Sequence, residues 1–186
     1  MKLNDSISWI VLNGPTSKEW INTPLPGAVW GCNLAYKDFD LTHLCLVDQP
    51  SIDSIAQDPP PCEILCRERG RRFPRTMKGC VIPGIDAGSF AFEQSMIRYP
   101  LHQHIIIGAD GILGLDHITR YKYAWRSTTQ VQQKVHKLHE QTFLKLIKQY
   151  DCNYVFVSNQ NHKEFKTANE HTIRKTYLGL DAQHTE

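Results

Sequence analysis

The chain has no apolar run that approaches the roughly 20 residues needed to span a bilayer. Its first seven residues, MKLNDSI, contain no signal-peptide core. We therefore expect a cytoplasmic protein without a membrane span or, for a viral protein, one found in the host cytoplasm or the virion. The formal net charge of +2 is too small to argue for nucleic acid or a membrane surface as a partner.

Several catalytic and metal-binding patterns are also missing. The P-loop pattern GxxxxGK[ST] does not occur, and no Ser-His-Asp arrangement is visible. The six cysteines mostly lie in or beside strand-like runs, which favours buried reduced thiols. Zinc binding by Cys62, Cys66 and Cys80 is a minor alternative, because a fourth ligand and the usual paired spacing are absent.

What remains is an ordinary globular composition, with 41% hydrophobic and 22% charged residues in 186. Strand-like and helix-like segments alternate, which predicts an α/β, Rossmann-like three-layer domain with a mainly parallel sheet. We expect a nucleotide-binding domain over residues 1–158. Residues 159–186 are expected to form a C-terminal extension, with one helix near Glu164–Tyr177, that packs on the domain or on a partner.

The expected elements are short apolar runs separated by helical patterns. The predicted strands are Trp9–Leu12, Val29–Asn33, His43–Asp48, Glu63–Arg67, His104–Gly108 and Tyr154–Ser158. The predicted helices are Ser17–Ile21, Ser51–Gln57, Ser89–Arg98 and Ser127–Tyr150. The last helix has a capping-box pattern at its start and an apolar face that includes Leu138 and Leu146.

Two asparagines follow predicted strands near the start of the chain. Asn13 ends the run WIVLN and precedes Gly14 and Pro15, and Asn33 ends the next strand 20 residues later. Ligands of parallel α/β sheets bind where strands end in loops. Glycine lets the backbone approach a ligand closely, and helix N-termini attract phosphate. This segment predicts a nucleotide site.

Three aspartates also fall at predicted strand ends or turns. Asp48, Asp86 and Asp110 would converge with the two asparagines at one crevice. Carboxylates beside a phosphate need a divalent cation between them, so magnesium held by Asp48 and Asp110 is the cofactor that the pattern suggests. The alternative is that each aspartate is a helix cap or a turn residue.

Five motifs in order carry a family resemblance: NGPTSK, GCNL, VDQPSI, DAGSFA and IIIGAD. Between Ile7 and Asp116 the chain resembles the small bacterial sialyltransferases that use CMP-sialic acid, and the related hydroxymethylpterin diphosphokinase-like domains. The resemblance implies that Asn13, Gly14 and Asn33 hold the nucleotide. In the positions of the family's Thr-Ser-Gly phosphate contact this chain has Asp86, Ala87 and Gly88.

Together these arguments predict one set of nucleotide-binding residues, namely Asn13, Gly14, Pro15, Asn33, Asp48, Asp86, Gly88 and Ser89. His117 and Asp110 are the candidate catalytic residues, with His117 as the general base. Tyr121 and Tyr123 are substitutes for the family's tyrosine pair. His136 and His139 share a helix face but lack a third metal ligand, which favours surface histidines.

An arginine-rich loop follows the fourth predicted strand. Arg71, Arg72 and Arg75 would grip a phosphate through their guanidinium forks, or touch a nucleic-acid backbone, or form a solvated loop. The leading functional prediction is a glycosyltransferase-like protein that binds a nucleotide or nucleotide-sugar. The alternatives are a non-catalytic structural or interaction protein with an assembly partner, such as a phage component, and a magnesium-dependent diphosphokinase.

Overall fold

The computed structural model describes residues 6–66, 86–114 and 129–180, with the backbone alone for 129–136. Seven strands form one sheet in which every neighbouring pair is parallel, in the order β4-β3-β2-β1-β5-β6-β7. The strands are β1 (Ile7–Val11), β2 (Ala28–Cys32), β3 (His43–Leu46), β4 (Glu63–Cys66), β5 (Gln103–Ile107), β6 (Asn153–Val157) and β7 (Thr167–Ala168).

The strand order places a topological switch point between β1 and β5. Strands β1 to β4 are added outward in one direction, and β5 to β7 are added in the other. In open α/β sheets, the loops that leave such a point in opposite directions open a crevice at the carboxyl ends of the strands. The fold therefore defines where a ligand site is expected before any side chain is considered.

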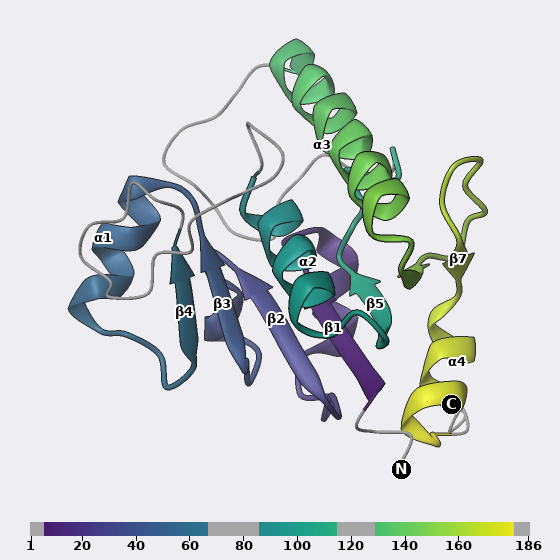
Figure 1. Cartoon of the computed structure of the whole chain (residues 1–186), viewed down its shortest axis with the longest axis horizontal. Coiled ribbons are helices and arrows are strands. Elements are labelled where there is room, and N and C mark those ends of the chain that lie inside the picture. The colour runs from purple at the N-terminus through teal and green to yellow at the C-terminus, as the bar shows by residue number, and fades with distance from the viewer. Residues whose placement is uncertain (1–5, 67–85, 115–128, 181–186) are drawn as a thin grey trace.

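Helices cover both faces of the sheet (Figure 1). The face with α2 (Ala87–Arg98) and α3 (Thr129–Tyr150) buries Phe92 and Phe143 against alternate strand residues such as Ile106. The opposite face carries the short helices η2 (Pro15–Trp20) and η3 (Ala35–Lys37), with α1 (Gln49–Gln57), α4 (Glu170–Ile173) and η4 (Arg174–Leu178). This arrangement confirms the predicted α/β three-layer, Rossmann-like fold.

The six predicted strands and four predicted helices are confirmed to within two residues at each end. The helix expected over Glu164–Tyr177 is wrong in its first half, where Thr167–Ala168 pairs with β6 instead. A two-residue strand is too short to leave a periodic signal. Leu138 is 54% exposed, because α3 meets the core through Phe143 and Leu146. Ser127, the expected cap, lies outside the described residues.

The cysteines of the described segments are all free, as expected. Burial raises the pKa of the Cys66 and Cys152 thiols to about 11, so both are protonated and unreactive at neutral pH. Cys62 immediately precedes β4 and Cys66 is its last residue, so the extended strand holds their Cα atoms about 13 Å apart, too far for one zinc ion. Cys80 lies outside the described residues. Within the described segments, no helix has the length and apolar character that crossing a membrane requires.

Candidate functional site

The loops that leave β1 and β5 are fastened together at the switch point. The Leu12 and Gly14 amides donate to the carbonyl oxygens of Ile107 and Gly108, each at 2.9 Å. A Cβ atom on Gly14 would lie 2.1 Å from Asp110 Oδ2 and 2.4 Å from the Gly108 carbonyl oxygen. Only glycine fits this close approach, so the predicted special role of Gly14 has a physical basis in packing between the two loops.

Asp110 closes the same junction through its side chain. Oδ2 accepts hydrogen bonds from Thr16 Oγ1 at 2.8 Å and from the Thr16 amide at 3.3 Å. The residue is 4% exposed. A buried carboxylate needs such donors, and here they come from the loop after β1 rather than from a ligand. Asp110 therefore holds the segment after β1 against the end of β5. We call this contact between Asp110 and Thr16 the Asp110 clip.

Asp86 is the N-cap of α2. Its Oδ1 accepts from the Gly88 amide at 2.8 Å and from the Ser89 amide at 3.0 Å, and Ser89 Oγ lies 2.5 Å from Oδ2. A Cβ on Gly88 would lie 2.8 Å from Leu12 Cδ2, so the start of α2 packs directly on the end of β1. The amides that would bind a phosphate at this helix N-terminus already have the Asp86 carboxylate as their partner.

His139, on α3, lies beside Asp86 at the carboxyl ends of the strands. Its Nε2 lies 3.6 Å from Asp86 Oδ2, and both side chains are partly exposed, at 29% and 28%. The sequence pattern relates His139 only to His136, on the same face of the helix. Its pairing with Asp86 depends on how α3 packs against α2, which no local pattern of either helix specifies.

The two asparagines lie at adjacent strand ends but differ in their surroundings. Asn13 follows β1 and makes a contact within the protein, although its Oδ1 atom accepts no hydrogen bond. Asn33 follows β2 in the left-handed backbone conformation, with φ of 51°. Its Oδ1 atom is buried and accepts no hydrogen bond. A buried amide oxygen without a donor costs free energy, so this atom is suited to accept from a bound group.

A cavity of about 200 Å³ opens on the other side of the switch point. It lies where β1, β5 and β6 end, next to the Asp110 clip. Five of its seven lining residues have polar side chains, namely Thr16, Asp110, Ser158, Asn159 and Gln160, and the other two are Leu113 and Val157. The amide and hydroxyl groups can both donate to and accept from a hydroxyl-rich ligand, and the carboxylate can accept. The sequence motifs did not include residues 158–160.

Asp48 lies apart from the other candidates. It is exposed, and it precedes α1 without capping it through its side chain. Strands β2 and β1 separate its strand from β5, a lateral distance of about 14 Å. Asp48 and Asp110 therefore do not meet around one metal ion, which corrects the predicted magnesium pair. Among the described residues, no three metal-ligating side chains form a group.

Other candidate residues lie outside the described residues and remain predictions. These are the general base His117, the phosphate-binding arginines Arg71, Arg72 and Arg75, and the substitutes Tyr121 and Tyr123. Pro15, by contrast, is described and begins η2 immediately after Gly14. It therefore belongs to the fastened loop at the switch point.

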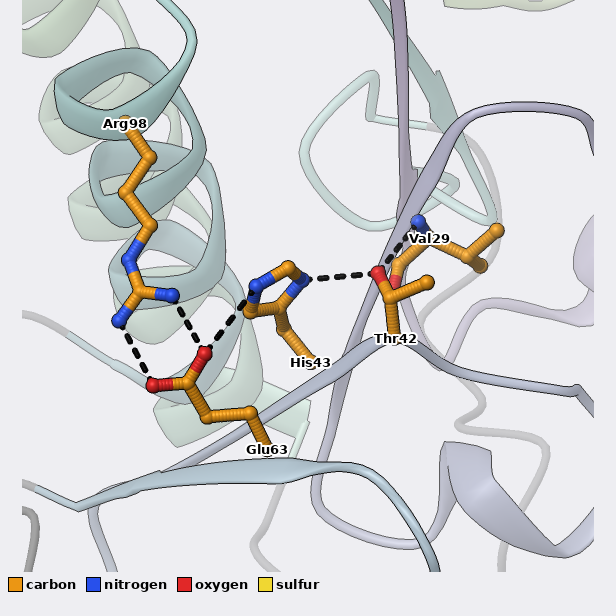
Figure 2. A network of polar contacts seen from close by, with 5 residues as sticks. All are labelled: Val29, Thr42, His43, Glu63 and Arg98. Atoms are coloured by element: carbon orange, nitrogen blue, oxygen red, sulfur yellow. Dashed lines mark hydrogen bonds and ion pairs between the residues drawn. The ribbon is translucent and has the colours of Figure 1, made fainter.

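A second polar cluster lies at the amino ends of the strands, on the opposite side of the sheet from the switch-point crevice (Figure 2). Arg98, at the end of α2, donates through both guanidinium NH2 groups to the two carboxylate oxygens of Glu63, at 2.5 and 2.9 Å. His43 Nε2 lies 3.4 Å from Glu63 Oε2, and His43 Nδ1 lies 2.8 Å from Thr42 Oγ1. We call Thr42, His43, Glu63 and Arg98 the amino-edge network.

The Thr42 hydroxyl has one proton and two acceptors within reach. The Val29 amide donates to Thr42 Oγ1 at 2.8 Å, and the hydroxyl donates either to the Val29 carbonyl oxygen at 2.9 Å or to His43 Nδ1 at 2.8 Å. In the second case the proton of neutral His43 lies on Nε2, which faces Glu63 Oε2 at 3.4 Å. Burial and the nearby Arg98 charge lower the pKa of His43 to about 4, which keeps the ring neutral at pH 7. The amino-edge network ties β2, β3, β4 and α2 together.

The fold and the switch-point crevice define a doubly wound, Rossmann-like α/β protein. No family model, curated protein or solved structure matches the chain. Its function is therefore argued from its own residues. The resemblance to sialyltransferases and diphosphokinase-like domains remains a prediction from the sequence.

Proposed function

We propose that this protein is glycosyltransferase-like and binds a nucleotide or nucleotide-sugar across the switch point between β1 and β5. The base and ribose would lie over the ends of β1 and β2. The sugar would occupy the polar cavity near Ser158 and Gln160. This placement agrees with the general location of ligands in open α/β sheets.

The observation that carries the proposal is the unpaired Oδ1 of Asn33. In dinucleotide-binding folds, the residue at the end of the second strand accepts a hydrogen bond from a ribose hydroxyl. Asn33 occupies that position, 20 residues after Asn13, and its free atom is an acceptor. A ribose hydroxyl or a base amino group is the complementary donor.

The cavity beside Asp110 supports a sugar as the second part of the ligand. Its volume of about 200 Å³ suits one small ring rather than a second nucleoside. Ser158, Asn159 and Gln160 bring hydroxyl and amide groups to its wall. Such groups recognise sugar hydroxyls because each can donate and accept.

In a transfer reaction, the pair of Asp86 and His139 would serve the acceptor. A carboxylate 3.6 Å from Nε2 stabilises the imidazolium that forms when the other ring nitrogen removes a proton from an acceptor hydroxyl. The leaving phosphate would not bind the first turn of α2, whose Gly88 and Ser89 amides are already paired with Asp86. It would require donors from elsewhere.

The non-catalytic alternative has an observation of its own. Asp86 and Asp110, the carboxylates expected to do chemistry, are both hydrogen-bonded within the protein. A protein that retained the fold for assembly would keep these structural contacts and need no ligand. The diphosphokinase alternative has less support, because the same hydrogen bonds compete with a metal for the carboxylate oxygens.

The test is calorimetric titration with CMP, CDP, UDP, CMP-sialic acid and ATP, each with and without magnesium. Asn33→Gly removes the amide while keeping the left-handed backbone, and Asn22→Gly is the matched control, because Asn22 is exposed with φ of 65°. We expect Asn33→Gly to weaken nucleotide binding about tenfold, the value of one hydrogen bond, and Asn22→Gly to leave it unchanged.

Three other results would change the conclusion. A wild-type protein that binds none of the nucleotides would favour the non-catalytic alternative. Binding of ATP only with magnesium would favour the diphosphokinase. Binding that Asn33→Gly leaves intact would overturn the assigned position of the ribose.

A further inference from the structure

A second cavity lies at the amino ends of β5 and β6, whereas the switch-point crevice lies at the carboxyl ends of the strands. Its volume is about 250 Å³. The sheet forms one wall, and α4 with η4 forms the other, next to β7 at the end of the sheet opposite α1 (Figure 1). The proposed nucleotide site does not use this cavity.

The cavity has a cationic residue and an apolar floor. Lys166 lines it, with its Nζ atom 5.7 Å from the centre of the Tyr154 ring. Val155, Ala168 and Ile173 supply the apolar surface. An amine held over an aromatic face is positioned without being neutralised, because the ring carries no formal charge.

The charge of Lys166 is not compensated. Within the part of the chain that the structure describes, Lys166 makes no ion pair with a carboxylate. None of the ten residues that line the cavity is acidic. The other polar groups of the lining are neutral hydroxyls and amides, including those of Thr172, Thr176 and Tyr177. Burial raises the pKa of Tyr177, so its hydroxyl stays protonated and able to donate.

One ammonium group, several hydroxyl donors and no acid are the features of an anion site. We propose that this cavity binds a small organic anion, whose carboxylate or phosphate pairs with Lys166 and whose apolar body contacts Val155, Ala168 and Ile173. The volume sets the size of the ligand at roughly one ring with its anionic group. The site is distinct from the switch-point crevice and does not depend on the proposed nucleotide function.

The test is an amide NMR titration with two probes, phenyl phosphate and benzoate, at constant ionic strength. The two probes share a ring and differ in the anionic group. Lys166→Gln removes the charge, and Lys163→Gln is the matched control, because Lys163 is an exposed lysine in the same segment that does not line the cavity. Both substituted positions are exposed, so both variants should fold.

We expect saturable shifts at the amides of Tyr154, Thr172 and Tyr177 with at least one probe. Lys166→Gln should weaken that binding at least tenfold, and Lys163→Gln should change it less than twofold. Response to one probe alone supports the site and identifies its anionic group. The proposal is overturned if neither probe gives saturable shifts, or if both variants bind as the wild type does. Nucleotides would shift Asn33 and Gly108 instead, so the two proposals can fail separately.

Discussion

The amino ends and the carboxyl ends of the strands both carry clusters of polar side chains. The two clusters differ in how many of their hydrogen-bonding groups have partners within the protein. We call these two sides of the sheet the amino edge and the carboxyl edge. At the amino edge, Arg98, Glu63, His43 and Thr42 form an unbroken chain of contacts. At the carboxyl edge, Asp86 and Asp110 are paired within the protein, while Asn33 keeps a buried acceptor without a donor. A polar cluster is therefore evidence of a ligand site only where hydrogen-bonding capacity is left over.

Some polar atoms in the core also lack a hydrogen-bond partner, so an unpaired atom does not by itself identify a ligand site. Trp30 Nε1, Gln94 Oε1 and His104 Nε2 are also buried without a hydrogen bond. Their residues are 0%, 2% and 0% exposed and lie between α2 and the sheet, where no ligand has access. Asn33 differs because it is partly exposed and follows a strand at the edge where ligands bind.

The largest expected effect is a loss of folding stability at low pH, caused by two buried histidines near the amino ends of the strands. Burial lowers the pKa of His104 to about 4, as it does that of His43. The unfolded chain then takes up protons below pH 6.5 while the folded protein does not, so stability is complete above pH 6.5 and falls as the pH approaches 4. His104 alone should account for about 2 kcal/mol of the loss between pH 7 and pH 4.5. Urea unfolding at pH 7 and pH 4.5 measures the loss.

His104→Gln is the control for this prediction, because glutamine does not titrate and keeps a polar group for Ser95, whose Oγ lies 3.0 Å from His104 Nδ1. This variant should lose less stability between the two pH values than the wild type does. An equal loss in both proteins would show that His104 is not the responsible group.

The second effect concerns the ion pair of the amino-edge network. Glu63→Ala removes the carboxylate that accepts from Arg98 and faces His43 Nε2, and it leaves both without this partner. We expect a loss of about 2 kcal/mol, below the value for a fully buried pair because both charged groups are partly exposed. Nucleotide affinity should not change. Urea denaturation and calorimetry, with the exposed Glu164→Ala as control, would check both halves of the prediction.

At the carboxyl edge, the Asp110 clip should matter less for stability and more for binding. Asp110→Asn keeps an acceptor for Thr16 but removes the charge that strengthens both hydrogen bonds, at a cost of about 1 kcal/mol. Because the clip positions the loop beside Asn13, nucleotide binding should weaken as well. Thr16→Val removes the hydroxyl from the same contact and should produce the same pattern. Unchanged binding in both variants would separate the clip from the site.

The smallest effect is expected where α4 meets η2. A hydrogen bond with Glu170 and partial burial raise the pKa of Glu19 to about 7, and Arg174 opposes this shift only in part. A raised carboxyl pKa favours folding below pH 4.5, and the contribution is lost as the pH rises through 7. Glu19→Gln should therefore stabilise the protein by less than about 1 kcal/mol at pH 8, because the site is exposed, and not at pH 5. Thermal unfolding at both values provides the comparison.

Much of the fold could be predicted from the sequence because the strands are buried runs with a local signature. Runs such as HIII in β5 and HLCL in β3 are apolar on both faces, as parallel strands between two helical layers must be. The positions of Asn13 and Asn33 at strand ends followed from the same runs. β7 could not be predicted, because a two-residue strand is defined by its pairing with β6 rather than by its own residues.

The candidate site was predictable in its location but not in the roles of its acids. The residue pattern alone specifies the alternating elements, and these put Asn13, Asn33, Asp48, Asp86 and Asp110 at the carboxyl ends of the strands. The packing of separate elements decides that Asp110 pairs with Thr16, that Asp86, the cap of α2, meets His139, and that Asp48 lies apart. Periodicity reports which face of an element is buried, whereas hydrogen-bond partners depend on how separate elements pack, and that information is not local.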